Sequence, residues 1–214
     1  MTTTMADSMT DNDINPRTAE QARRGRRIAL ALFAIGFGPM LLATVMYFTG
    51  WLNPTGQANH GDLIQPLVPI SQLNLVGDDG RRLADRFTSP TAPRQWLMLV
   101  AAEGCDADCE SLLYLARQVN IALGKDADRV MRAAFLAGIA QGQRNQVAAE
   151  YGTMELLSPG AREPIWPTGA DPATAPRILL VDPLGNVMMQ YTTANSGEDM
   201  LKDLKRLLKL SQLG

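Results

Sequence analysis

The sequence predicts an α/β domain, with a central mixed sheet flanked by helices, preceded by one N-terminal transmembrane helix. Two observations carry this prediction. The stretch from 28 to 49 contains no charged residue, and a helix of that length can cross a bilayer core of about 30 Å. Beyond it, apolar runs alternate with segments of helical periodicity, in the order β-β-β-α-β-α-β-β-α.

The charges around the apolar stretch predict its orientation. "RRGRR" (23–27) precedes it, and no positive charge follows until Arg81. This asymmetry places the N-terminus in the cytoplasm and the rest of the chain across the membrane. A cleaved signal peptide and a buried core helix are the alternatives. A signal peptide has a shorter apolar run that ends in small residues, whereas this one ends in "YFTGWL", which favours a retained anchor.

An anchor of this kind gives four segments. Residues 1–27 are expected to be a disordered cytoplasmic tail and 28–52 the transmembrane helix. The proline-rich stretch 53–70 is expected to be a linker, and 71–214 an exported domain. In a bacterium the anchor lies in the inner membrane and the domain in the periplasm, an oxidising compartment where two cysteines can form a disulfide.

Composition excludes several functional classes. The net charge is −2, so no nucleic-acid partner is expected. The single histidine, His60, argues against a histidine-rich zinc centre and against a Cys–His–Asn protease. His60 either binds a partner or a metal near the membrane, or is simply solvated in the linker.

The exported domain divides into elements by pattern. "QLNLVGDDGRRLADRF" (72–87) predicts a hairpin around Asp-Asp-Gly, and "QWLMLVAA" (95–102) a central strand buried on both faces. Further helices and strands are expected at 106–124 (helix), 129–138 (strand), 143–152 (helix), 177–193 (strand, Pro-Leu-Gly turn, strand) and 197–213 (amphipathic helix with an outer face of Lys202, Lys205, Arg206 and Lys209).

From residue 95 onward this order is that of a thioredoxin-like fold, and "GCDADC" lies where its first central strand meets a helix. The helix N-terminus favours a thiolate at Cys105, and the spacing places Cys105 and Cys109 on one face of the first turn. The acidic residues around the pair oppose a thiolate but attract a cation. Cu(I) binding, a redox-active dithiol and a structural disulfide remain open. Asp106 is a natural N-cap.

Pro176 stands directly before the apolar strand "RILLV". In a thioredoxin-like fold a cis-proline at this position packs beside the dithiol and presents backbone to a partner. The alternative is that Pro176 only begins an edge strand.

These residues together resemble the Sco-type family of cytochrome c oxidase assembly proteins. The shared features are the anchor, the apolar strand leading into Cys-x-x-x-Cys, and "ILLVDPLGNV", which is similar to the Sco strand–turn segment. "YFTGWLNPTGQANHGDLIQP" further resembles small inner-membrane proteins encoded with bacterial oxidase genes. The resemblance implies a thioredoxin-like fold over 70–212, cytochrome c oxidase subunits or their assembly factors as partners, and Cu(I) as the metal on Cys105 and Cys109.

The chain departs from the Sco pattern at two points. Counting back from Gly185, Thr174 stands where the family has its copper-binding histidine, and the loop between the cysteines lacks the usual proline. Copper binding is therefore less expected than in a standard Sco protein. The sequence favours an assembly factor that works by thiol–disulfide exchange or Cu(I) handling, rather than a classical enzyme. The alternative is a non-catalytic structural or interaction subunit of a respiratory complex with a fixed disulfide. A general secreted disulfide oxidoreductase is less favoured, because the loop lacks Cys-x-x-Cys spacing.

Overall fold

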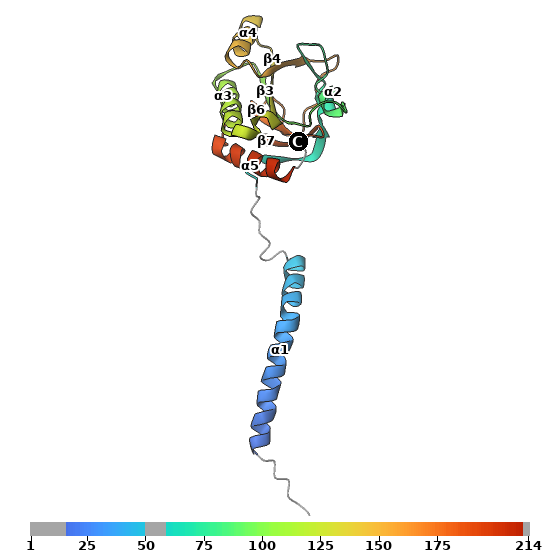
Figure 1. Ribbon diagram of the computed structural model, residues 1–214, viewed down its shortest axis with the longest axis vertical. Coiled ribbons are helices and arrows are strands. Elements are labelled where there is room, and N and C mark those ends of the chain that lie inside the picture. The colour runs from blue at the N-terminus through green and yellow to red at the C-terminus, as the bar shows by residue number, and fades with distance from the viewer. Residues whose placement is uncertain (1–15, 50–58, 212–214) are drawn as a thin grey trace, which may run out of the picture. The chain divides into compact units, whose positions relative to one another are not determined.

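The computed structural model describes residues 16–49 and 59–211, with the side chains of 16–22 left out. Contacts divide the chain into two units, Met1–Gly56 and Gln57–Gly214, which are treated separately (Figure 1). Parts of the expected tail, anchor and linker, at 1–15, 50–52 and 53–58, lie outside the described residues.

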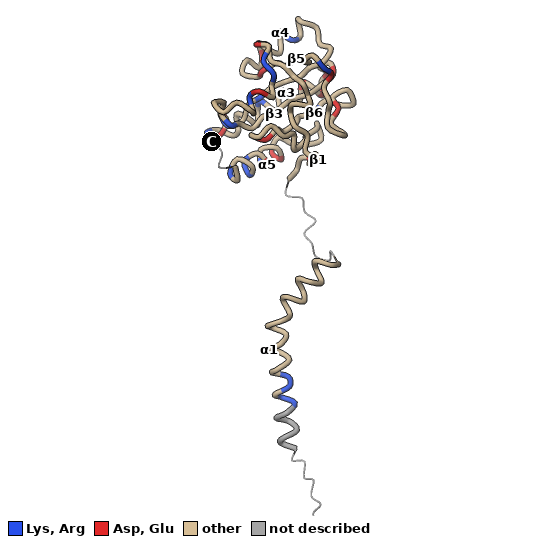
Figure 2. Tube along the Cα trace, turned by 90° about the vertical axis from the view of Figure 1, so that its right-hand side faces the viewer, with Lys and Arg blue, Asp and Glu red and all other residues tan. Residues whose placement is uncertain are grey.

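The first unit contains one long helix, α1 (Pro16–Thr49), whose segment Arg23–Thr49 is long and apolar enough to cross a membrane. Arginines at 23–27 lie toward its N-terminal end, and residues 28–49 carry no charge (Figure 2). The prediction of a disordered tail up to residue 27 is wrong for 16–27, because the helix already begins at Pro16. Proline suits the first helical position, and the Ala, Gln and Arg residues that follow favour a helix.

The second unit is built on a seven-stranded mixed sheet with the order β1-β7-β6-β3-β4-β5-β2. Its strands are β1 (Asp62–Pro69), β2 (Leu75–Gly77), β3 (Trp96–Glu103), β4 (Val130–Ala137), β5 (Glu155–Pro159), β6 (Arg177–Val181) and β7 (Asn186–Tyr191). Its helices are η1 (Ile70–Leu73), α2 (Asp85–Thr88), α3 (Ala107–Ala122), η2 (Gly124–Arg129), α4 (Gln141–Glu150) and α5 (Gly197–Leu210).

The centre of the sheet confirms the predicted thioredoxin-like arrangement. β3 runs parallel to β4 and antiparallel to β6, and β6 pairs antiparallel with β7. Seven of the eight β3 residues are buried, as are all five in β6. Both faces of these strands are therefore covered, which explains why they lack a polar alternation.

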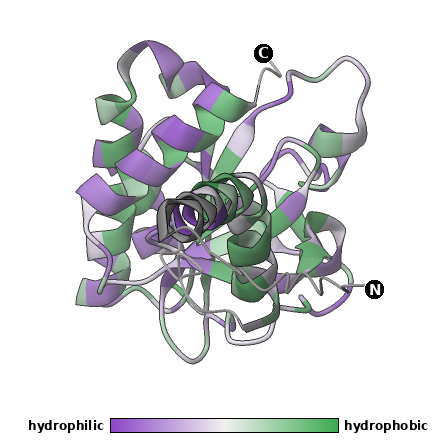
Figure 3. Cartoon of the chain, turned by 90° about the horizontal axis from the view of Figure 1, so that it is seen from below, coloured by the Kyte–Doolittle hydropathy of each residue, from purple (hydrophilic) through white to green (hydrophobic). Residues whose placement is uncertain are grey.

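Alternate side chains of β3 enter two cores. Met98 and Val100 pack with α3 and α5, whereas Leu97 and Leu99 pack with η1 and Leu83 on the other face. α3 and α5 thus form one layer over the sheet (Figure 1). The helix that leads to the C-terminus shows hydrophilic and hydrophobic bands (Figure 3), as the amphipathic pattern of α5 predicts.

Three expectations at the sheet edges are wrong. Residues 62–69 of the expected linker form β1, which pairs with β7 across a bulge. The predicted hairpin keeps its first strand, β2, and its turn, but its second strand is reduced to one bridge, Val76–Arg82, and β2 also pairs with β5. The strand β5 was not predicted, because five residues ending in proline carry little pattern.

β1 and β2 occupy opposite edges of the sheet although only five residues separate them. Seven strands in a flat sheet would hold these edges about 29 Å apart. The connection between Pro69 and Leu75 spans about 22 Å at most. The sheet is therefore curled, and η1 packs on the face that carries Leu97 and Leu99. The Ile70 amide donates to the carbonyl of Gly185, between β6 and β7, at 2.7 Å.

Candidate functional site

The two cysteines form a disulfide where β3 leads into α3, with their Cα atoms 5.1 Å apart. Cys105 lies before the helix and is half-buried, whereas Cys109 lies in its first turn and is fully buried. A partner outside the domain can therefore reach only the Cys105 sulfur. The two sulfurs are adjacent, as expected, but Cys105 precedes the N-cap Asp106 and does not lie on the first turn of α3.

Local backbone interactions hold this junction. Gly104 has φ +76°, a left-handed conformation that glycine adopts without strain, and its amide donates to the Ala137 carbonyl at the end of β4. Asp106 is the N-cap of α3, as predicted, because its carboxylate accepts from the Cys109 amide at 3.0 Å. The same side chain thus caps the helix and fixes the backbone of the buried cysteine.

We expect Asp106→Ala to lower the free energy of unfolding by about 1 kcal/mol, because the α3 cap is lost. The change also removes a negative charge beside Cys105 and frees a backbone N–H, so the reduced Cys105 should alkylate a few-fold faster. Urea unfolding and iodoacetamide kinetics measure the two effects. Ser196→Ala, which removes the corresponding cap of α5, is the matched control: it should lower stability without changing alkylation. Equal alkylation rates in the two variants would contradict the assignment.

A cleft of about 210 Å³ opens beside the disulfide, between α3 and α4. Cys105 lines it from one side, and the apolar side chains of Leu113, Val147 and Tyr151 line its inner part. Its remaining lining residues are polar: Glu110, Gln143, Gln146 and Glu150. The exposed sulfur therefore faces a recess with an apolar interior and a polar, acidic rim.

Burial raises the pKa of Tyr151, and the neighbouring Glu150 and Glu110 carboxylates raise it further, against the opposing effect of Arg117. The phenol therefore stays protonated at neutral pH and remains a hydrogen-bond donor in the cleft.

Pro176 lies next to the site by strand register. Arg177 pairs with Ala101 of β3, so the antiparallel register sets Pro176 opposite Ala102, near the end of the strand that leads to Cys105. The expected cis bond is wrong: in the described part of the chain the cis peptide joins Gln65 and Pro66, and Ala175–Pro176 is trans. Trans is the intrinsically favoured isomer, and here the Arg177 Nε donates to the Ala175 carbonyl at 3.1 Å.

His60 keeps 42% of its side chain exposed but is not free in a linker. Its Nδ1 lies 2.9 Å from Asp203 Oδ1, and the His60 and Gly61 amides donate to Asp203 Oδ2 at 2.8 and 3.0 Å. The hydroxyl of Tyr191, on β7, also donates to Asp203 Oδ2, at 3.1 Å. This group ties the start of the second unit to α5. His60 is therefore held by a structural contact and is not a free linker residue.

The residues around the disulfide do not fit a three-ligand copper centre. Within the described ranges no three His, Cys, Asp or Glu side chains cluster in a way that could hold a metal ion. His60 is engaged by Asp203, and Thr174, at the position of the Sco histidine, lies in an exposed turn closed by its amide and the Asp171 carbonyl. After reduction the pair would offer Cu(I) two sulfurs and no third ligand.

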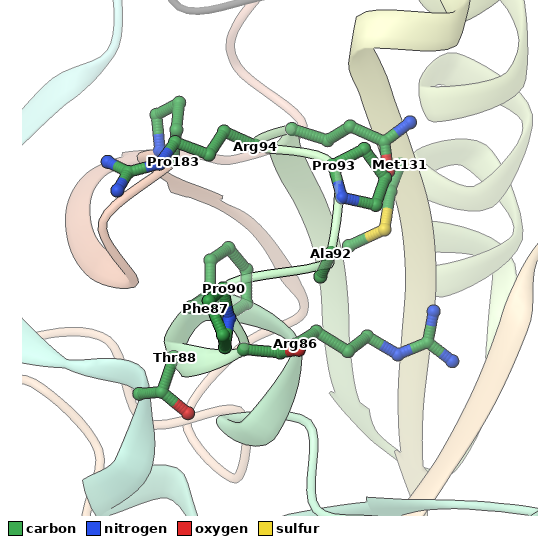
Figure 4. Close-up of a pocket in the computed structure, with 11 residues that line it drawn as sticks. Arg86, Phe87, Thr88, Pro90, Ala92, Pro93, Arg94, Met131 and Pro183 are labelled. Atoms are coloured by element: carbon green, nitrogen blue, oxygen red, sulfur yellow. The ribbon is translucent and has the colours of Figure 1, made fainter.

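A larger cavity, of about 280 Å³, lies at the opposite end of β3, beside Gln95 and Met131. Figure 4 shows the Arg94 side chain extending toward Pro183 and the Arg86 side chain extending away from it. Arg86 pairs with Glu155 at 2.7 Å. The Arg86 and Arg94 guanidinium groups therefore do not converge on a common point. The lining of this cavity also contains no cysteine, whereas the α3–α4 cleft is lined by Cys105.

Comparison with known families decides where the chain belongs. Residues 96–211, more than half of the sequence, match the family described as transmembrane-like, thioredoxin-like, C-terminal domain. The chain belongs to this family. Residues 20–50 match the companion family, transmembrane-like, N-terminal domain, so the membrane-type helix and the thioredoxin-like domain occur together as predicted. A comparison with curated proteins gave no match.

Several solved structures are similar to this transmembrane-like, thioredoxin-like protein. BsSco, a member of the Sco family of cytochrome c oxidase assembly proteins, is 15% identical, with a TM-score of 0.45 over 72% of this chain and 98% of that chain. Copper-bound yeast Sco1 is 10% identical, with a TM-score of 0.48 over 72% and 96%. A DsbF homologue from Corynebacterium diphtheriae is 15% identical, with a TM-score of 0.48 over 73% and 97%.

The sequence analysis identified the cysteine pair but not the polar side of α4 that lines the cleft beside it. Gln143, Gln146 and Glu150 recur along α4 at spacings of three and four residues, which places them on one side of that helix. This periodicity was a usable signal for a polar face. The position of this polar face beside Cys105 depends on how α4 packs against the end of the sheet, and no local sequence pattern encodes that packing.

Proposed function

We propose that this protein is an accessory factor in cytochrome c oxidase biogenesis that acts by thiol–disulfide exchange at Cys105 and Cys109. The observation that carries the proposal is the asymmetry of the disulfide, whose Cys105 sulfur lines an open cleft while the Cys109 sulfur is buried below it. An exchange-active pair needs one sulfur that a partner can reach and one that is kept for the second step.

In the proposed reaction, the reduced Cys105 thiolate attacks one sulfur of a partner disulfide and the partner's other sulfur leaves as a thiolate. The Cys109 thiolate, after losing its proton to solvent, then attacks the Cys105 sulfur and releases the partner's second sulfur. The partner gains two electrons and the pair becomes the disulfide present here. A dithiol reductant must return two electrons to Cys105–Cys109 before the next cycle.

Pro176 is proposed as the residue that presents backbone to the partner segment. Its support is the register that sets it opposite Ala102, near the strand end that precedes Cys105. An extended partner backbone would meet the backbone at Pro176, just before β6, while its sulfur approaches Cys105.

The proposed setting is a bacterial inner membrane, with α1 as the anchor, the N-terminus in the cytoplasm and the second unit in the periplasm. The arginines before the apolar segment support this orientation. The oxidase as partner is supported by the Sco-like sequence features, namely the anchor, the Cys-x-x-x-Cys pair and "ILLVDPLGNV".

Exchange by the reduced full-length chain tests this function. We expect it to reduce 2-hydroxyethyl disulfide, Cys105→Ser to abolish the reaction, and Cys109→Ser to stop at a mixed disulfide detectable by mass. The two variants remove the same disulfide, so their difference cannot come from its loss alone. No reaction by the wild type, or the same behaviour in both variants, would exclude the function.

The alternative is a non-catalytic interaction subunit with a fixed disulfide, which the acidic loop and the missing third copper ligand favour. Oxidase assembly that is unchanged in cells with Cys105→Ser and Cys109→Ser together would establish it. Cu(I) titration of the reduced chain addresses the metal separately: tight one-to-one binding that is lost in the double variant would add copper handling to the proposed role.

A further inference from the structure

The cleft beside Cys105 has a strongly asymmetric charge. Two carboxylates, Glu110 and Glu150, line it, and its lining contains no lysine or arginine. Glu103, Asp106 and Asp108 are exposed within three residues of Cys105 along the chain. A group that approaches the reachable sulfur therefore enters a region surrounded by five negative charges.

An arginine on α3 opposes this field. Arg117, one helical turn beyond Leu113 on α3, acts electrostatically on Tyr151 at the cleft. It leaves the surroundings of Cys105 with a net negative charge. Arg144 on α4 does not add to it, because its guanidinium is bonded to Asp78 and to the carbonyls of Leu156 and Leu157.

We propose that the cleft selects a positively charged substrate, a cysteine-containing segment flanked by lysine or arginine. This inference rests on the proposed exchange function and names the substrate class of the same site. Glu110 and Glu150 line the same cleft as Cys105, and charges in water act over a Debye length of about 8 Å at physiological salt. Such a field concentrates cations and repels anions. The apolar interior formed by Leu113 and Val147 receives the side chain next to the reacting cysteine.

Charge also acts on the reaction itself. The leaving sulfur of the partner departs as a thiolate, and negative charge around Cys105 disfavours a second negative charge next to it. Lysine or arginine beside the partner cysteine offsets this repulsion in the mixed disulfide. The same cation therefore helps both the approach and the bond exchange.

Three small disulfides that differ in charge test the proposal: cystamine, which is cationic, 2-hydroxyethyl disulfide, which is neutral, and dithiodiglycolate, which is anionic. Each is mixed with the reduced full-length chain in neutral detergent. We expect cystamine to react about tenfold faster than dithiodiglycolate at low salt, after division by their rates with free dithiothreitol. The ratio should fall toward one as salt is raised.

Two double variants test whether the charge preference comes from the carboxylates that line the cleft. Glu110→Gln combined with Glu150→Gln should slow cystamine, speed dithiodiglycolate and reduce their ratio several-fold. Asp62→Asn combined with Glu163→Gln changes the net charge equally at exposed positions that do not line the cleft, and it should keep the wild-type ratio.

The outcomes separate this inference from the function on which it rests. A ratio of one that salt does not change, or an equal effect of both double variants, would overturn the charge selection while leaving exchange intact, provided that 2-hydroxyethyl disulfide reacts. If none of the three reagents reacts, the exchange function fails and the substrate class fails with it.

Discussion

Asp203→Asn should lower the free energy of unfolding by about 2 to 4 kcal/mol at neutral pH. Asp203 lies on α5 with only 3% of its surface exposed, and its two oxygens accept from the His60 ring, two backbone amides and the Tyr191 hydroxyl. An asparagine of the same size presents an amide NH₂ to donors that need an acceptor. Donors left buried without a partner are costly.

The loss of stability in Asp203→Asn should become smaller at low pH. Burial raises the pKa of Asp203, but hydrogen bonds from His60, Gly61 and Tyr191 outweigh it and hold the pKa below its usual range. The folded state therefore binds fewer protons at this site than the unfolded state, whose carboxyl has a pKa of about 3.9. The stabilisation is complete above that value and is lost as pH falls through the lower folded pKa. The stability difference between wild type and Asp203→Asn should accordingly shrink below about pH 4.

Urea unfolding of the full chain between pH 3 and 7 measures this difference. Glu198→Gln, which removes an exposed carboxylate from the same helix, should change stability little. Tyr191→Phe removes one of the four donors and should cost about 1 kcal/mol. If the free energy of unfolding of Asp203→Asn at pH 7 equals that of the wild type within error, the contact of Asp203 does not hold His60 and Gly61 to α5.

Arg177→Met should also lower the free energy of unfolding by about 2 to 4 kcal/mol. The Arg177 side chain is buried at 6% exposure, where its guanidinium donates to the carbonyls of Gly169 and Ala175 and to the Gln190 side chain. Methionine fills the volume of the side chain but leaves the carbonyls without donors. Because Arg177 follows Pro176 directly, the loop that reaches the site should loosen first.

Limited proteolysis reports on this loop. We expect faster cleavage between 160 and 176 in Arg177→Met, together with slower exchange at Cys105 because Pro176 is displaced. Arg81→Met, at an arginine with 83% of its side chain exposed, should leave both unchanged. Arg177→Lys should recover part of the stability, since a lysine keeps the charge but cannot make all three contacts. An unchanged cleavage rate in Arg177→Met would show that Arg177 does not hold the loop between 160 and 176 in place.

The centre of the fold was predictable because its signals are local. β3 and β6 are continuous apolar runs, α3 begins at an N-cap residue, and α5 has a helical period of leucines. The edges were not predictable, because their signals are not local. β1 contains Pro66 and Pro69 and has no clear alternation, and it is a strand only because β7 lies beside it.

The candidate site divides in the same way. Cys105, Cys109 and the cap Asp106 are neighbours in sequence, so spacing alone brought them together. The partner of His60 is Asp203, 143 residues further along the chain, and no spacing rule connects two such positions. The trans bond before Pro176 was likewise not encoded in any local pattern.

The position of β1 and β2 at opposite edges of the sheet has a consequence for how the chain is made. A ribosome produces β1 first, yet its pairing partner is β7, with Asp62 opposite Gln190, and the strand beside β2 in the sheet is β5. Neither edge can form while the middle of the chain is still emerging, so the sheet is completed only when almost the whole domain has been synthesised. Truncation from the C-terminus therefore removes the pairing of the first strand together with the last.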